Sequence, residues 1–191
     1  MNNWINICYI LLPLILAGVS NMIFVKIKFL GFLKTPIDNN ISLIDGKRLF
    51  GDNKTWKGFM GMIIFTAFWT SVLVFIFPDS LNFVFNSTEK NAVSVFALGA
   101  ILGLAYVLFE LPNSYIKRRL SIAPGKSGKG LLKYIFILVD QADSVIGCAI
   151  VLYFLYAISL SLTLQLILIG TLVHYIINVI LFFVKLKSQP A

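Results

Sequence analysis

Charged residues are scarce in this sequence: they make up 13% of its 191 residues, and only eight are acidic. A typical soluble domain carries roughly 25%. Histidine occurs once and cysteine twice. Neither Cys8 nor Cys148 has a histidine or second cysteine at metal-ligand spacing, which argues against a zinc-finger type of site, and we expect both thiols to be buried. Hydrophobic residues reach 59%, so the composition predicts an integral membrane protein.

Five runs of the sequence are apolar and long enough to cross a bilayer, which takes roughly 20 residues in a helix. No positive charge precedes the first run and no clear cleavage site follows it, so we interpret it as a helix and not as a signal peptide. We predict an all-α, polytopic transmembrane protein with one domain over residues 1–191. Its five helices are expected at residues 4–25, 59–77, 92–111, 134–158 and 161–184.

The basic residues predict how the helices are oriented. Seven of the 16 lysines and arginines lie in residues 26–58, six in residues 112–133 and two in the C-terminal tail, which leaves only Lys90 elsewhere. Basic loops tend to stay on the cytoplasmic side of a membrane. We therefore expect a protein of the cell membrane with its N-terminus outside and its C-terminus in the cytoplasm, where the two basic loops also lie.

Asp140 and Asp143 are the most unusual residues, because they interrupt the apolar run 134–158. An ionised carboxylate inside a membrane costs several kcal/mol on lenient scales, so two of them indicate a function. Three residues apart on a helix, their side chains share one face. A helix starting near Tyr134 would place them about 9 to 14 Å from its cytoplasmic end. A pair of carboxylates with room for water and phosphate suits Mg²⁺, and we predict that both aspartates bind it.

The acidic pair also has two alternative interpretations. Asp140 and Asp143 could form ion pairs with a lysine or arginine of a neighbouring helix, or they could form the proton or ion relay of a small transporter. A relay predicts a path that continues across the membrane, whereas the run that follows Asp143 carries no further charged residue. This pattern favours a pocket that is closed at one end, as an enzyme requires.

The two basic loops contain the residues expected to recognise phosphate. We expect Pro112 to end the third helix. Beyond it, Lys117 and Arg118 precede a glycine-rich segment that includes Gly125, and glycines allow backbone amides to approach an anion. The glycine and lysine spacing is not that of a Walker motif, and a flexible loop bound to anionic lipid headgroups remains an alternative. Lys54 and Thr55, at the entrance of the second helix, are also placed to hold phosphate.

With these residues assembled, the chain resembles the CDP-archaeol synthase family, membrane enzymes that activate ether lipid phosphates with CTP. The resemblance rests on residues 49–60, 110–125 and 140–147. That family is similar to the phosphatidate cytidylyltransferases, whose signature includes S-x-x-K-R, a Pro-Gly turn and D-x-x-D. The chain lacks two further elements of that signature, a Lys-Asp pair after the Lys-Arg step and a His-Gly-Gly before the aspartates. The matching residues are Ser114, Lys117, Arg118, Pro124, Gly125, Asp140 and Asp143.

The resemblance implies that a lipid phosphate attacks the α-phosphorus of CTP to give a CDP-lipid and pyrophosphate. It implies CTP, a phosphorylated lipid and the bilayer as partners, with no nucleic acid, and leaves the oligomeric state open. Glu110 is expected to be a further ligand or the partner of a nearby arginine, with the second favoured. His174 and Asn178 are expected in the outer half of the membrane, in contacts between helices. The implied roles are Mg²⁺ binding and catalysis by Asp140 and Asp143, catalysis by Lys117 and Arg118, and substrate binding by Lys54, Thr55, Asn113, Ser114 and Gly125.

Overall fold

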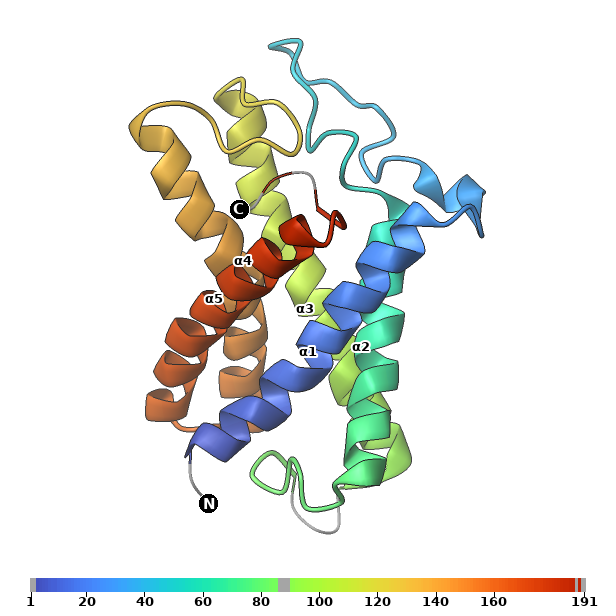
Figure 1. Ribbon diagram of the computed structural model, residues 1–191, viewed down its shortest axis with the longest axis vertical. Helices are drawn as coiled ribbons and strands as arrows, with labels where there is room; N and C mark the ends of the chain where they lie inside the picture. The colour runs from blue at the N-terminus through green and yellow to red at the C-terminus, as the bar shows by residue number, and fades with distance from the viewer. Residues whose placement is uncertain (1–2, 86–89, 188, 190–191) are drawn as a thin grey trace.

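Five long helices make up the protein in the computed structural model, which describes residues 3–85, 90–187 and 189. Within these residues a short 3₁₀ helix, Gly31–Lys34, is the only other named element, and no strand forms. All five helices are long and apolar enough to cross a membrane, which confirms the predicted multi-pass architecture. The start of α1 and the end of α5 lie toward opposite ends of the bundle (Figure 1). The helices are α1 (Asn3–Lys26), α2 (Trp56–Ile76), α3 (Ala92–Arg119), α4 (Leu131–Tyr156) and α5 (Leu160–Phe183).

Polar side chains fix where three of these helices begin. The Thr55 hydroxyl accepts a hydrogen bond from the backbone of Gly58 at the start of α2, and Ser159 accepts one from Leu162 at the start of α5. Asn91 forms a capping box at the start of α3. Such caps satisfy backbone donors that have no partner inside the helix. All observed helix ends lie within three residues of the predicted limits, with one exception.

The exception is the C-terminal end of α3, because the prediction that Pro112 ends this helix is wrong. The helix continues through Pro112 to Arg119. Proline removes one backbone hydrogen bond, and membrane helices tolerate this when neighbouring groups stabilise the segment. Here Asn113 and Lys117, which follow the proline, bind side chains of α4. Lys117 and Arg118, which were predicted to lie in a loop, thus lie on the last turn of a helix.

The helices form a ring in sequence order, in which each helix packs on the next and α1 also touches α5. The closest approach joins α2 and α3: a β-carbon added at Gly103 would lie 2.7 Å from the α-carbon of Ile63. Glycine therefore lets the two backbones meet, as expected for helix packing in membranes. Cys148 is buried as predicted, but Cys8 is exposed on the surface of α1. Its outward orientation could not be derived from hydropathy, because both faces of a membrane helix are apolar.

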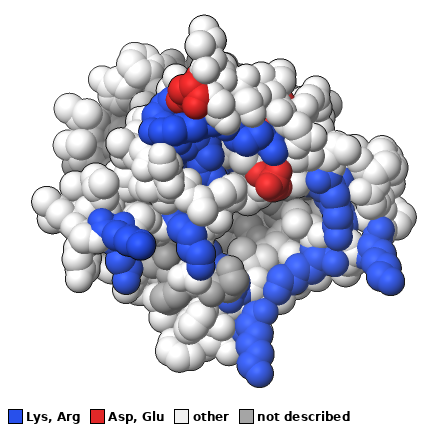
Figure 2. Space-filling model, turned by 90° about the horizontal axis from the view of Figure 1, so that it is seen from above, with Lys and Arg blue, Asp and Glu red and all other residues white. Residues whose placement is uncertain are grey.

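Most of the lysines and arginines lie at one end of the bundle, where the loops α1–α2 and α3–α4 and the C-terminal segment meet. Seen from above, this face shows lysine and arginine side chains around a central hollow, with an acidic side chain at its edge (Figure 2). We call it the basic end. The predicted gathering of basic segments on one side is confirmed for the described residues, whereas the side of the membrane to which it belongs remains a prediction.

Candidate functional site

A polar cavity of about 340 Å³ lies at the basic end, between α3, α4, α5 and the two basic loops. Of the nine residues predicted to form the site, only Thr55 does not line it. The structure thus brings together residues from four separate segments of the chain. The eight predicted residues that line the cavity are Lys54, Asn113, Ser114, Lys117, Arg118, Gly125, Asp140 and Asp143.

The two acidic side chains converge on one amide. Nδ2 of Asn113 donates hydrogen bonds to Oδ1 of Asp140 at 2.7 Å and to Oδ2 of Asp143 at 2.8 Å. Nζ of Lys117 lies 2.6 and 2.5 Å from the two carboxylate oxygens of Asp140. Asn113 and Lys117 are four residues apart and so share one face of α3. The expected convergence of the acids is confirmed, and an ion pair with a lysine of a neighbouring helix is present as well.

These carboxylates lie farther from the start of α4 than predicted. Because α4 begins at Leu131 and not near Tyr134, Asp140 and Asp143 are about 14 and 18 Å along the helix from its start. A buried carboxylate is tolerated only with hydrogen bonds or opposite charge. Asn113 and Lys117 supply both from α3, so the extension of that helix past its proline is what makes the deep acidic pair possible.

The chemistry of the pair fits a magnesium ion. Mg²⁺ prefers carboxylate oxygens together with water and substrate phosphate, and Asp140 and Asp143 each direct an oxygen to one shared donor atom. The amide of Asn113 and the ammonium of Lys117 now bind these oxygens. They occupy lone pairs that a divalent cation could also use. The described residues contain no group of three or more acidic, histidine or cysteine side chains that could hold a metal ion. Such a site would depend on the substrate for its remaining ligands.

Arg118 lies beside the acidic pair and has unused donors. Its side chain is buried, and Nε and Nη1 have no hydrogen-bond partner within the described segments of the chain. A buried guanidinium without an anion is costly, and its planar fork matches the oxygens of a phosphate. Gly51 of the first loop packs directly against it, since a β-carbon there would lie 2.9 Å from Nη1. The cavity therefore contains one acidic centre and one cationic centre side by side.

Lys54 and Glu110 form an ion pair across the cavity wall. The partner of Glu110 is therefore a lysine, and the expectation of an arginine is wrong. Thr55 is used as the cap of α2 and lines an adjoining cavity of about 330 Å³ between α1, α2 and the first loop. Both cavities share Lys54 and Glu110. The first loop thus supplies groups to two connected spaces.

Sequence reasoning gave no place in the site to several residues that line the polar cavity. Tyr106, His174 and Lys187 all line it. The placement of His174 in the outer half, away from the site, is wrong: counted from the start of α5, it lies beyond the middle of the helix, toward the basic end. Burial lowers the pKa of Lys187 below its ordinary value, while the charge of Asp140 opposes this shift. In the sequence, only the basic character of the C-terminal segment could have indicated that Lys187 lines the site.

The predicted contacts of His174 and Asn178 between helices are confirmed. Nδ1 of His174 lies 3.1 Å from the backbone oxygen of Gln141, so this nitrogen carries the proton and donates. Nε2 lies 3.1 Å from the hydroxyl of Tyr106. Nδ2 of Asn178 donates to Oε1 of Gln141 at 2.5 Å. These bonds join α3, α4 and α5 next to the acidic pair, since Gln141 lies between Asp140 and Asp143 in the chain.

The first loop is organised around Asp38, a residue that sequence reasoning did not single out. Its side chain is fully buried and accepts hydrogen bonds from Nη2 of Arg48 at 2.5 Å and from the backbone of Phe50 and Gly51 at 3.0 and 3.1 Å. Burial opposes ionisation, but the bonds from Arg48 and the backbone prevail and lower its pKa from 3.8 to about 2. Asp38 therefore holds Gly51 against Arg118 through the backbone.

Comparisons with known proteins give one consistent result. The family described as CarS-like CDP-archaeol synthase matches residues 1–190. The CDP-archaeol synthase of Thermofilum pendens is 32% identical over 183 residues, which are 94% of this chain and 77% of the relative. That of Pyrococcus furiosus is 33% identical over 158 residues, 82% of this chain and 83% of the relative. A solved structure, of an intramembrane enzyme for archaeal membrane lipids biosynthesis, shares the fold with a TM-score of 0.63 at 20% identity, over 90% of this chain and 92% of that one.

Replacing Asp38 with asparagine should loosen the first loop. The folded pKa of about 2 lies below the unfolded value of 3.8, so the carboxylate stabilises the loop above about pH 4 and loses this effect as the pH falls toward about 2. We expect pepsin to cleave Asp38→Asn several-fold faster than the unmodified protein at about pH 4, with the difference narrowing at lower pH. Asp52→Asn, at an exposed partner of Arg48, is the control and should leave cleavage unchanged. Equal cleavage of Asp38→Asn and unmodified protein at the higher pH would contradict this role.

Proposed function

The chain belongs to the CDP-archaeol synthase family, and on that basis we propose that it transfers the cytidylyl group of CTP to an archaeol-type ether lipid phosphate, releasing pyrophosphate. It is a CTP-dependent cytidylyltransferase of lipid biosynthesis. One observation supports the proposed reaction above all: the polar cavity places the acidic pair beside a buried arginine whose donors are unused. A nucleoside triphosphate with its metal carries both kinds of charge that this arrangement complements.

The reaction needs positioning and neutralised charge more than a protein nucleophile. The attacking atom is a phosphate oxygen of the lipid, the new bond forms to the α-phosphorus of CTP, and the bond to the β-phosphate breaks with pyrophosphate leaving. In our proposal Arg118 and Lys117 stabilise the negative charge on the transferred and leaving phosphates. Lys54, Ser114 and the backbone at Gly125 bind the triphosphate. Thr55 takes part through the adjoining cavity.

Asp140 and Asp143 would hold Mg²⁺, which would neutralise negative charge on the phosphates of the bound nucleotide. In the absence of substrate, Lys117 and Asn113 occupy the carboxylate oxygens and make the partly buried acids tolerable. When substrate binds, the same ammonium becomes free to contact phosphate. The lysine thus has one anionic partner in each state, which avoids an unpaired charge at every stage.

The proposed reaction also fits the proposed orientation in the cell membrane. With the basic end in the cytoplasm, CTP reaches the cavity from solution and the lipid head from the inner leaflet. The positive potential of this face would concentrate both anionic substrates at the cavity. Transport through the acidic pair has no comparable support, because α4 beyond Ser144 carries no charged side chain.

A direct assay tests the reaction. We expect purified protein in detergent to release pyrophosphate and form a CDP-lipid from CTP, Mg²⁺ and an ether lipid phosphate. Omission of the metal, the lipid or CTP should each abolish product. A panel containing diacyl and ether lipid phosphates with the same headgroup would show which linkage is used. No product with any lipid on the panel would refute the proposed function.

Asp140→Asn and Asp143→Asn should each abolish turnover. The amide retains the size of the side chain but removes the negative charge that a divalent cation needs, so we expect a rate loss of more than about 100-fold. Mg²⁺ binding, measured by calorimetry in the presence of a CTP analogue, should weaken in parallel. Thermal unfolding in detergent reports whether the variants fold. Near-normal activity in either folded variant would rule out the metal assignment.

Lys117→Ala should lower activity far more than Lys129→Ala. Both residues lie at the basic end, but Lys117 is buried beside Asp140 whereas Lys129 is exposed in the loop before α4. We expect a loss of about 100-fold or more for the first and less than about threefold for the second, since removal of one stabilising donor from a reaction site costs on this scale. Equal losses would mean that the basic end acts only as a diffuse positive surface.

A further inference from the structure

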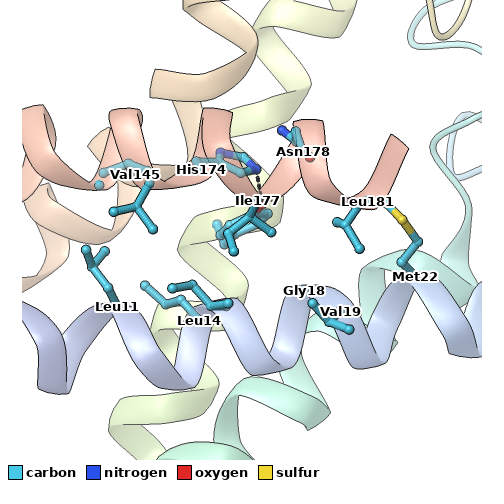
Figure 3. A pocket seen from close by; sticks show the side chains of 14 residues that line it. Leu11, Leu14, Gly18, Val19, Met22, Val145, His174, Ile177, Asn178 and Leu181 are labelled. Carbon is cyan, nitrogen blue, oxygen red and sulfur yellow. Dashed lines mark hydrogen bonds between the residues drawn. The ribbon is translucent and has the colours of Figure 1, made fainter. Parts of the chain in front are cut away.

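A third cavity lies between α1 and α5 (Figure 3) and differs in character from the polar one. We call it the α1–α5 groove. It is narrower than the polar cavity, with a volume of about 90 Å³ against about 340 Å³. Side chains of Leu11 and Leu14 from α1 are directed toward α5, and Val145 of α4 closes one side (Figure 3). The remaining lining is also mainly aliphatic and includes Val19, Met22, Val173, Ile177 and Leu181.

Among the described residues no charged side chain lines the groove, and its few polar groups are directed to one another. Asn178 and His174 both bind Gln141 of α4, and His174 also binds Tyr106 of α3. Their hydrogen-bonding capacity is therefore largely used inside the protein. A ligand in this groove meets hydrocarbon along most of its length, and such a surface binds hydrocarbon.

The groove is continuous with the polar cavity. Met22, Tyr106, His174 and Asn178 line both spaces. One end of the groove thus reaches the cavity that contains Asp140 and Asp143. A molecule with a phosphate head and an apolar chain could place the head among the charged groups and the chain between α1 and α5.

We propose that the α1–α5 groove binds one hydrocarbon chain of the lipid phosphate, close to its headgroup, and that Gly18 makes room for it. This inference rests on the proposed function. A β-carbon added at Gly18 would meet no atom of the described residues within 4 Å, so this glycine borders open space and not a packed neighbour. Gly170 on the opposite helix differs, since a β-carbon there would lie 2.7 Å from Val145. The open space therefore lies on the α1 side, where Gly18 borders both the groove and the adjoining cavity and a β-carbon fits without displacing protein atoms.

The location also explains how a lipid reaches the site from the side. α1 and α5 contact one another less extensively than any two helices that are consecutive in the chain. A hydrocarbon chain can therefore lie between α1 and α5 while the four interfaces between consecutive helices stay closed. The occupant is a chain of the substrate because the groove leads from the membrane directly to the charged, phosphate-binding groups of the polar cavity.

Gly18→Leu tests this proposal, with Gly31→Leu as the matched control. A β-carbon at Gly31 also meets no described atom within 4 Å, but this glycine lies in the first loop, away from the groove. We expect Gly18→Leu to lower kcat/KM for a long-chain ether lipid phosphate by about 10-fold or more, because bulk in an apolar pocket discriminates on this scale. For a short-chain analogue with the same head, the effect should be less than about twofold. CTP affinity should be unchanged in both variants.

The outcomes separate this inference from the proposed function. If the unmodified protein forms no CDP-lipid from any lipid, the function itself fails. If the unmodified protein is active, and Gly18→Leu has the same kcat/KM for the long-chain lipid as Gly31→Leu, only the groove assignment fails. Ile177→Phe narrows the groove from α5 and should reproduce the selective loss, which guards against a folding defect peculiar to one variant.

Labelling gives an independent readout. A long-chain lipid phosphate with a photoreactive group in its chain should attach to residues 14–22 or 173–181, and excess unlabelled lipid should prevent this. Gly18→Leu should reduce the labelling, and Gly31→Leu should not. Attachment only at other helices would overturn the proposal. So would a dimer, detected by light scattering, that Gly18→Leu dissociates, because the occupant would then be a second copy of the chain.

Discussion

The cost of burying two carboxylates in a membrane bundle governs the arrangement of this protein. Asp140 and Asp143 can lie deep in α4 only because Asn113 and Lys117 meet them from α3. That encounter requires α3 to remain helical for two turns beyond its proline. The same turns then carry Arg118 to the cavity and Arg119 to the first loop, so one electrostatic requirement determines the length of a helix and the position of three cationic groups.

The first loop extends this arrangement outward. Arg119 binds Asp45 through two contacts of 2.6 Å, and Lys47 donates to the backbone oxygen of Arg119 at 2.7 Å. Buried Asp38 fixes the backbone that follows. The loop is thus attached to the end of α3 and not free at the surface. Because the backbone before it is held in place, Lys54 has a defined position in the polar cavity.

Much of this could be predicted from the sequence, and the failures share a physical cause. The helix count followed from the length of the apolar runs, and the acidic pair stood out because charge is costly there. Hydropathy does not reveal which face of a membrane helix is inside, so Cys8 was placed wrongly. Local rules for proline took no account of the bonds that α4 offers to α3. The partner of Glu110 depended on the path of a loop, which periodicity does not describe.

The ring of helices closes between the first and the last of them, and this has a consequence for how the protein is made. α3 and α4 can assemble their ion pair as soon as both are inserted, but His174, Asn178 and Lys187 arrive only with α5. During synthesis the acidic pair therefore stays open to its surroundings on one side until α5 has been made. We expect the nascent chain to become competent for its reaction abruptly, at the moment when α5 enters the bilayer and meets α1.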